Sequence, residues 1–431
     1  MLRKSDRFSG RKNPIKDLAM DKLAKEKKLN FIYILINSIY WIVCCATGGY
    51  AYNYLSESRY ADGTPVSDGT AGAIIAVIYL VTVVLQARLG SMIDKSEKIT
   101  ERDALTAIFA SAAILAFAMS WIRSASLLLF AVMVICYSLM STASPFINSL
   151  CFAYSGEGIS INYGLGRGMG SAAYALASLL IGSLWARFGK AFVPYYVVIS
   201  CIIGVVIIQM LPKYQKMRQG GKEKAKSLSY PEFFRRYGIM IPMLISMVML
   251  FFGASMINVF MARVVANILG PEASAVSGAV ASVQGRALAL QAIVELPAMF
   301  FFYKLRLRFS VDRLLEISAA AFFTKFLLIR LAKSIGMFYF ALCFQMAGYA
   351  VLQPAVVYFV QENIKEEDRN KGQALMGAAG IFASFLASLA GGQLLQRLGV
   401  SPVLTISVVV IGFGAALMIV SLLKHQKEHK Q

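Results

Sequence analysis

Long apolar runs separated by short charged loops are the feature that most constrains this chain. Each run has about 20 residues, which matches the ~20 residues that a helix needs to cross a ~30 Å hydrocarbon core. Over the whole sequence 58% of the residues are hydrophobic and 15% are charged, whereas soluble domains have about 45–50% and about 25%. The sequence therefore predicts an all-α polytopic membrane protein.

We expect twelve transmembrane helices, because backbone amides in lipid must find their hydrogen-bond partners within the protein. The first run follows ten Lys and Arg residues and is too long for a cleaved signal sequence, so we interpret it as the first span. The predicted spans are residues 29–52, 70–90, 104–122, 125–154, 164–186, 191–212, 238–266, 277–303, 314–332, 335–362, 372–396 and 401–423.

The Lys and Arg residues are distributed unevenly between the two sides of these spans. With the N-terminus in the cytoplasm, 31 of the 43 fall in cytoplasmic segments and 6 fall in external ones. The positive-inside rule then predicts a multi-pass protein of the cytoplasmic membrane with both termini cytoplasmic. The net charge of +20 would face the anionic lipid leaflet, so we expect a lipid bilayer and no nucleic acid as partner.

Catalytic and metal-binding patterns are missing from the sequence. All six cysteines lie in predicted spans without metal-ligand spacing. The two histidines, His425 and His429, lie in the C-terminal tail, so no imidazole inside the membrane could act as a general base. No nucleotide-binding Gly–Lys loop occurs. We expect no enzymatic activity, no metal and no cofactor.

The chain divides into two halves of six spans around its longest cytoplasmic loop, which is basic and polar. A weak repeat relates "GSLWARFGK" (182–190) to "GQLLQRLGV" (392–400), an offset shared by Gly170 and Gly380. Two such halves predict two six-helix bundles with pseudo-two-fold symmetry, an arrangement typical of secondary transporters that bind solute between the halves. The predicted segments are a basic cytoplasmic tail (1–28), an N-terminal bundle (29–212), a basic linker (213–237), a C-terminal bundle (238–423) and a cytoplasmic tail (424–431).

The second span ends in "LQARLGSMIDKSEK" (85–98), where Gly90, Asp94 and Lys95 form the pattern G-x-x-x-D-K. A glycine lets two helices approach closely. The Asp94 carboxylate could accept charge-assisted hydrogen bonds from a neighbouring helix end. The pattern predicts a conformational latch in a cytoplasmic loop, and an ordinary solvated loop is the alternative.

Several stretches together resemble the major facilitator superfamily, and within it the lactose-permease-like branch of oligosaccharide–proton symporters and phenylpropionate permease relatives. They are "GAIIAVIYLVTVVLQARLGSMIDK" (72–95), "SPFINSL" (144–150), "NYGLGRGMGSAAYALASLLIG" (162–182), "QAIVELPAMFF" (291–301) and "ENIKEEDRNKGQALMG" (362–377). The resemblance implies two six-helix bundles around a central cavity that work by alternating access, as a monomer.

Arg167 lies near the cytoplasmic start of the fifth span. A charged side chain inside a span costs free energy unless it has a partner or faces a polar cavity. The glycines around it leave room for a ligand, and its guanidinium suits paired hydroxyls or a carboxylate. By the resemblance, an Arg at this place binds sugar hydroxyls together with a Glu of the fourth helix. That Glu position falls on Asn148. Snorkelling of Arg167 to the interface is the alternative.

Other polar residues inside the spans extend the predicted substrate site. We expect Arg286 and Lys325 to face the cavity, and we add Gln345 and Trp41 to the site. The deep charges are three cations against one carboxylate, and because buried charges normally pair, this surplus favours an anionic or strongly hydrogen-bonding solute.

Glu295 is the candidate proton carrier. By the resemblance, lactose permease couples protons through a His and a Glu of its tenth helix, but those places fall on Gln345 and Gly348. Glu295, the one carboxylate deep in the predicted spans, is then the remaining candidate, with pairing to Lys325 or to a loop base as the structural alternative.

The main hypothesis is a secondary-active transporter of a small polar solute, a saccharide or glycoside, coupled to protons. An organic-anion transporter is the first alternative, and a transporter-like sensor that does not transport is the second.

Overall fold

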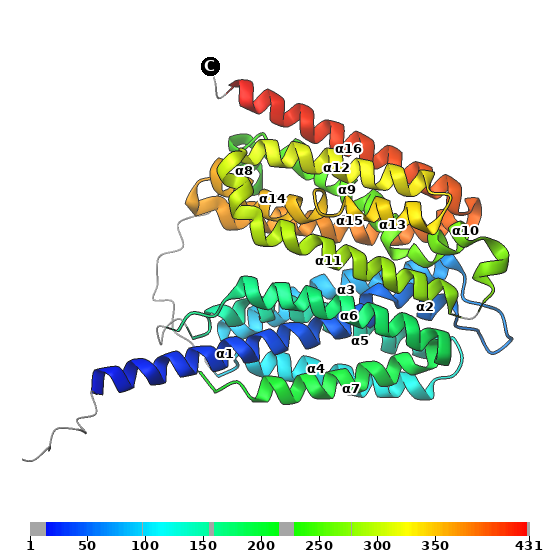
Figure 1. The fold of residues 1–431 in the computed structure, drawn as a ribbon, viewed down its shortest axis with the longest axis horizontal. Coiled ribbons are helices and arrows are strands. Elements are labelled where there is room, and N and C mark those ends of the chain that lie inside the picture. The colour runs from blue at the N-terminus through cyan, green and yellow to red at the C-terminus, as the bar shows by residue number, and fades with distance from the viewer. Residues whose placement is uncertain (1–13, 97, 155–158, 215–227, 277, 429–431) are drawn as a thin grey trace, which may run out of the picture.

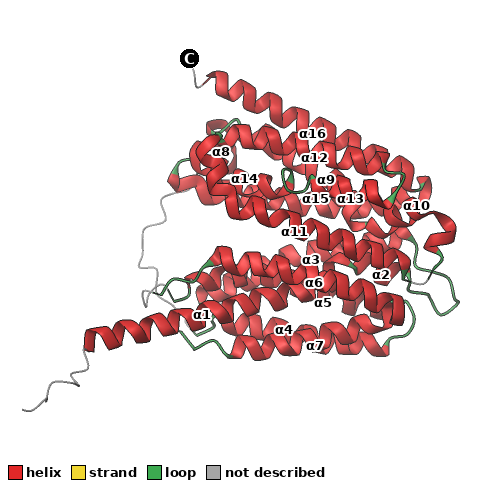
Figure 2. Cartoon of the chain, viewed as in Figure 1, coloured by secondary structure: helices red, strands yellow, loops and turns green. Residues whose placement is uncertain are grey.

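The computed structural model describes residues 14–96, 98–154, 159–214, 228–276 and 278–428. Apart from loops, turns and one isolated bridge between Arg59 and Pro65, these residues are helical (Figure 2). The all-α fold class predicted from the apolar runs is thus confirmed.

The described residues of the first half form seven α-helices. They are α1 (Pro14–Cys44), α2 (Ala51–Ser56), α3 (Asp68–Lys95), α4 (Glu101–Trp121), α5 (Leu127–Ser149), α6 (Tyr163–Phe188) and α7 (Phe192–Gln209), and a π-helical turn, η1 (Cys45–Gly49), joins α1 to α2. The second half contains a short helix and eight further ones. They are α8 (Tyr230–Arg236), α9 (Met240–Val259), α10 (Met261–Ser274), α11 (Ala279–Arg308), α12 (Val311–Leu331), α13 (Ile335–Cys343), α14 (Tyr349–Asn363), α15 (Arg369–Leu398) and α16 (Val400–Glu428).

Each of the twelve predicted spans corresponds to one described helix or to consecutive helices. By length and hydropathy, nine described segments could cross a membrane, and one of them, Tyr163–Gln209, contains both α6 and α7. The ninth and tenth predicted spans fall below this measure. The ninth, α12, carries five charged side chains, and the tenth is divided between α13 and α14.

The helices extend further at both chain ends than the predicted tails allow. α1 begins at Pro14 rather than at residue 29, and α16 continues to Glu428 rather than ending at residue 423. Figure 1 shows α1 projecting from the bundles on the side where α16 also ends. We call the end of the molecule where α1 begins and α16 ends the inner end, and the opposite end the outer end.

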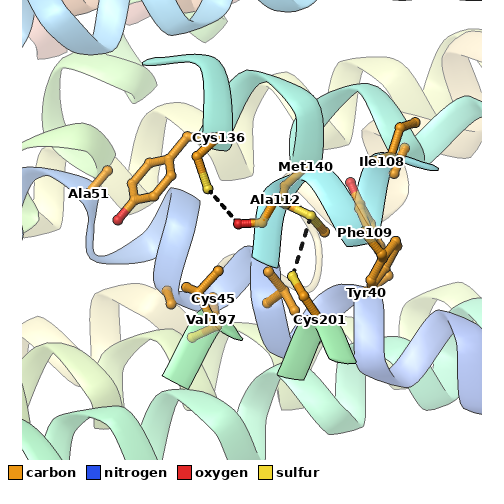
Figure 3. Close-up of a cluster of buried hydrophobic side chains, with 14 of the residues drawn as sticks. Tyr40, Cys45, Ala51, Ile108, Phe109, Ala112, Cys136, Met140, Val197 and Cys201 are labelled. Atoms are coloured by element: carbon orange, nitrogen blue, oxygen red, sulfur yellow. Dashed lines mark hydrogen bonds between the residues drawn. The ribbon is translucent and has the colours of Figure 1, made fainter. Parts of the chain in front are cut away.

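Two bundles lie side by side, α1–α7 in one and α9–α16 in the other (Figure 1). Each contains an extensive cluster of buried apolar side chains. Figure 3 shows part of the first, where Cys136 donates to the carbonyl of Ala112 at 3.5 Å and Phe109 is fully buried. A Cβ atom at Gly204 would lie 2.4 Å from the Phe109 ring, so this glycine lets α7 approach α4 closely.

The weak sequence repeat marks equivalent positions in the two bundles. Its two copies lie at the ends of α6 and α15, and each helix is followed by a glycine with positive φ, 58° at Gly189 and 79° at Gly399. Gly182 and Gly392, at the same offset, both press against the other bundle. A Cβ at Gly182 would lie 2.9 Å from the Ala281 carbonyl, and one at Gly392 would lie 2.5 Å from the Asp68 carbonyl. The repeat therefore preserves helix ends and interbundle crossings.

Three predicted spans are broken near the middle of the molecule. The first span passes through the π-helical turn Cys45–Gly49, the seventh bends at Phe260 (φ −100°, ψ 28°), and the tenth is interrupted between Cys343 and Tyr349. Broken helices expose backbone and side-chain polar groups and are tolerated at membrane depth where they line a cavity.

The predicted linker, 213–237, falls mostly on residues 215–227, which lie outside the described residues. Its last part forms α8, which begins with a capping box between Ser229 and Glu232. The buried Asp368 carboxylate accepts a hydrogen bond from the Tyr237 hydroxyl at 3.1 Å and one from the Leu228 amide at 3.3 Å. This end of the linker is therefore docked on the C-terminal bundle rather than forming an extended connection.

Candidate functional site

A cavity of about 760 Å³ lies between the two bundles. Broken spans contribute to its wall through Gly48, Gly49, Val259, Met261 and Gln345. From these breaks the lining continues toward the inner end, to Gln373 and Met376 in the first turns of α15. Its polar and aromatic lining also includes Trp41, Tyr79, Arg167, Ser171, Tyr174, Ser255, Asn258, Gln291, Glu295, Lys325, Tyr349, Gln353 and Ser384.

On the N-terminal bundle, Arg167 of α6 and Trp41 of α1 form one unit. The guanidinium carbon lies 4.3 Å from the centre of the Trp41 ring, and Nη1 donates a hydrogen bond of 2.9 Å to the Ser171 hydroxyl. The indole reaches this position because α6 has no side chain at Gly170, where a Cβ would lie 2.4 Å from the Trp41 ring. The cation–π contact fixes the guanidinium on the cavity wall.

On the C-terminal bundle, four side chains form a continuous hydrogen-bonded chain. The Lys325 ammonium is 1% exposed and donates to Gln291 Oε1 at 2.7 Å and to Gln345 Oε1 at 2.6 Å. The amide nitrogen of Gln345 in turn donates to Glu295 Oε1 at 2.6 Å. We call these four residues the Lys325 chain. Gln345 thus separates the buried cation from the carboxylate, and no direct ion pair joins them within the described part of the chain.

The bundles are closed against each other at the outer end. A Cβ at Gly72 of α3 would lie 2.3 Å from the Ser388 carbonyl of α15, and one at Gly285 of α11 would lie 2.4 Å from the Ser178 carbonyl of α6. Gln284 accepts a hydrogen bond of 2.9 Å from the buried amide of Asn53. The structure therefore shows one state of the protein, with its cavity shut toward the outer end.

Comparisons with known proteins agree with this architecture. A family model described as Major Facilitator Superfamily matches residues 243–431. No curated protein matches the chain. A crystal structure of a variant of the nucleoside transporter NupG has a TM-score of 0.74 at 15% sequence identity, covering 92% of this chain and 98% of NupG.

The chain has the major facilitator fold. A second solved structure, a bacterial homologue of the human lysosomal transporter Spinster in an inward-facing, unoccupied conformation, has a TM-score of 0.62 at 14% identity over 94% of this chain and 98% of the homologue. The family match covers less than half of the chain, in its second half, and the solved structures share its fold at low sequence identity. The finer resemblance to the lactose-permease-like branch stays a prediction.

The facilitator fold brings five of the predicted site residues to one cavity, namely Trp41, Arg167, Glu295, Lys325 and Gln345. It does not bring two others there. Arg286 is exposed on α11 and is absent from the cavity lining, to which α11 contributes Leu288, Gln291, Ala292 and Glu295. Five residues along a helix from Gln291 correspond to about 140° of rotation, which turns Arg286 away.

Asn148 lies in the last turn of α5, is partly buried, and is not among the residues that line the cavity. Its backbone carbonyl accepts a hydrogen bond from the Cys151 thiol at 3.0 Å. The structure therefore does not pair Asn148 with Arg167, whose described partners are Trp41 and Ser171.

Within the part of the chain that the structure describes, no contact of the predicted latch at Gly90, Asp94 and Lys95 is seen. A Cβ at Gly90 would meet no atom within 4 Å, so no helix approaches it closely. Asp94 and Lys95 are exposed at the inner end of α3. The interbundle crossings lie instead at the outer end, at Gly72 and Gly392.

Sequence reasoning missed several cavity residues, among them Asn258 and Tyr349. A signal for Asn258 was present, because an Asn near the outer end of an apolar run and close to a helix break is a polar group that needs a partner. The ion pair between Arg263 and Asp68 was missed as well. In the structure these two side chains, from different bundles, lie 2.9 Å apart.

Proposed function

We propose that this chain moves a small polar solute, a saccharide or glycoside, through the central cavity by alternating access. The observation that carries this proposal is the juxtaposition of the Arg167–Trp41 unit with the Lys325 chain on opposite bundles of one cavity. A guanidinium and an ammonium offer donors, a carboxylate offers an acceptor, and glutamine amides offer both. A molecule with several hydroxyl groups can satisfy all of them.

The aromatic lining favours a solute that also has a flat or apolar face. Trp41 meets Tyr174 edge to face at 5.9 Å, and Phe251 meets Tyr349 in the same way at 6.3 Å. Such rings bind sugar faces and planar heterocycles through apolar contact. A nucleoside is a glycoside that combines both features, and the shared fold of NupG, a nucleoside transporter, supports testing nucleosides first.

An organic anion is the second candidate, and the charge of the cavity favours it. Among the described residues, the charged side chains that line the cavity are Arg167, Lys325 and Glu295, which gives a surplus of one positive charge. A carboxylate solute would offset that surplus. A solute of this class needs only a cation at residue 167, whereas a hydroxyl-binding fork needs the guanidinium geometry.

Proton coupling would proceed through Glu295. Its Oε1 accepts from Gln345, while none of the described hydrogen bonds engages Oε2, and the side chain lines the cavity. A carboxylate with one oxygen fixed and one facing the cavity can exchange a proton with water or solute. We therefore expect Glu295→Gln to keep solute exchange and to lose uptake driven by a pH gradient.

A thermal-shift screen of detergent-purified protein tests the solute assignment. Nucleosides and other glycosides are compared with small aromatic and aliphatic carboxylates, on wild type, Arg167→Ala and Arg167→Lys. A glycoside that stabilises wild type and neither variant supports the main proposal. Stabilisation by carboxylates that survives in Arg167→Lys supports the organic-anion transporter. Binding without accumulation of solute in vesicles would favour a sensor.

A further inference from the structure

At the outer end, a carboxylate of one bundle and a cation of the other meet around a buried tyrosine. Asp68, in the first turn of α3, accepts hydrogen bonds from Arg263 Nη2 at 2.9 Å and from Arg263 Nε at 3.0 Å. The Tyr52 hydroxyl donates to the same carboxylate oxygen and accepts from Arg263 Nε at 2.9 Å. Asp68 and Tyr52 are buried, while the Arg263 side chain is 49% exposed.

Two of these three residues, Tyr52 and Arg263, lie on segments that follow helix breaks. Tyr52 lies on α2, directly after the π-helical turn of the first span, and Arg263 lies in the first turn of α10, after the bend at Phe260. The Tyr52 ring also packs edge to face on Phe260 at 5.0 Å. The same two breaks line the cavity through Gly49 and Met261, so the cavity ends where this contact begins.

The start of α3 is held on its other side as well. The Gly69 amide donates to Gln396 Oε1 of α15 at 3.1 Å. A Cβ at Gly392 of α15 would lie only 2.5 Å from the Asp68 carbonyl, so the two backbones are in close contact here. A solute can leave the cavity toward the outer end only if α3 separates from both α10 and α15, which breaks the ion pair.

We infer that Asp68, Arg263 and Tyr52 form an interbundle lock that holds the outer end closed and sets the population of the outward-open state. An ion pair with one partner buried and two hydrogen bonds is a strong contact, and it exists only in the closed arrangement. Removing it shifts the equilibrium toward the open arrangement by the free energy of that contact. The purpose of the lock rests on the proposed transport function, but its existence can be tested without any solute.

The test measures an interbundle distance between two spin labels by pulsed electron–electron double resonance in lipid nanodiscs. Spin labels replace Arg123, in the loop between α4 and α5, and Lys333, in the loop between α12 and α13, both exposed at the outer end. Cys343 and Cys44 are replaced by Ser, since the other four cysteines are buried. Neither label touches the lock, so a change in distance reports separation of the bundles.

We expect one short distance to dominate in the otherwise unchanged protein. Asp68→Asn and Arg263→Gln should each raise the ratio of the longer to the shorter distance about fivefold or more, the lower end of typical couplings. The double variant should add little to either single one, since both break the same contact. Arg306→Gln is the matched control, because it removes an ion pair with Glu362 inside one bundle. It should leave the distances unchanged.

An unchanged distance distribution in folded Arg263→Gln would overturn the inference. This variant keeps the test decisive if Asp68→Asn does not fold, because the Arg263 side chain is half exposed, so that its shortening to Gln leaves little buried volume unfilled. Lock variants that open the outer end while binding no solute of any class would support the lock and contradict the proposed function. The two failures can thus be told apart.

Discussion

Replacing Gln345 by Leu tests whether the Lys325 chain is one functional unit. Leu has a similar volume but forms neither of the 2.6 Å hydrogen bonds that Gln345 makes to Lys325 and Glu295. A hydrogen bond to a charged group contributes about 1.5–3 kcal/mol, so losing both costs up to ~6 kcal/mol. Glu295 lines the cavity, so water can replace its partner, and Lys325 keeps Gln291. The expected loss is therefore nearer ~3 kcal/mol.

The loss should appear in two measurements. The apparent melting temperature of purified Gln345→Leu should fall by several degrees, measured at a fixed heating rate because membrane proteins usually unfold irreversibly. Solute uptake should fall by at least about tenfold, since Lys325 and Glu295 are no longer held in position. Gln353→Leu is the matched control, because Gln353 lines the same cavity but takes no part in the described hydrogen bonds of the Lys325 chain. It should retain most of the uptake and stability.

A Gln345→Leu variant with wild-type melting temperature and wild-type uptake would refute this reasoning. It would mean that Lys325 and Glu295 act independently of the amide between them. Loss of stability with normal uptake would show that the amide supports the fold alone, so that its position in the cavity has no bearing on transport.

Three further predictions concern other parts of the molecule. Gly72→Leu should prevent closure of the outer end, because even a Cβ would lie 2.3 Å from the Ser388 carbonyl. Impermeant thiol reagents applied from the outer side should then label Cys44. Labelling of Cys44 at the wild-type level would contradict this prediction. Burial acts to raise the pKa of Asp103, but hydrogen bonds from the Thr100 amide and hydroxyl outweigh it and hold that pKa below its ordinary value. The ionised Asp103 therefore stabilises the fold above the pKa that this carboxyl has in the unfolded chain, and the stabilisation is lost as pH falls through its pKa in the folded protein. Asp103→Asn should lower the melting temperature at pH 7 and have no effect on it in acid. Trp41→Ala should weaken solute binding about tenfold or more by releasing the Arg167 guanidinium, and equal affinity in a calorimetric titration would exclude this role.

Helix positions were predictable because the hydrocarbon core imposes length and composition on every span. Lys325 and Glu295 were predictable as cavity residues for a related reason, since a charge inside a span is costly unless it faces a polar interior. The breaks in the first, seventh and tenth spans were not predicted. Gly48 and Gly49 indicate the first break in retrospect, but Phe260 and Phe344 are ordinary helix residues whose backbone is set by tertiary packing.

Side-chain direction limited the rest of the site prediction. Arg286 and Glu295 are nine residues apart on one helix and therefore face opposite sides, but the sequence does not say which side meets the other bundle. The partner of Arg263 could not be predicted either, because Asp68 is about 195 residues away in sequence and was counted as part of an external loop. Pairing across the bundles depends on how the two halves cross, and only the fold supplies that.

Uptake of nucleosides and other glycosides into proteoliposomes, with and without an imposed pH gradient, tests the central claim most directly. Wild-type protein should accumulate at least one such solute above equilibrium when the gradient is present, Glu295→Gln should only equilibrate it, and Arg167→Ala should do neither. Accumulation that is unchanged in Arg167→Ala, or uptake restricted to organic anions, would contradict a glycoside site built on the Arg167–Trp41 unit and the Lys325 chain.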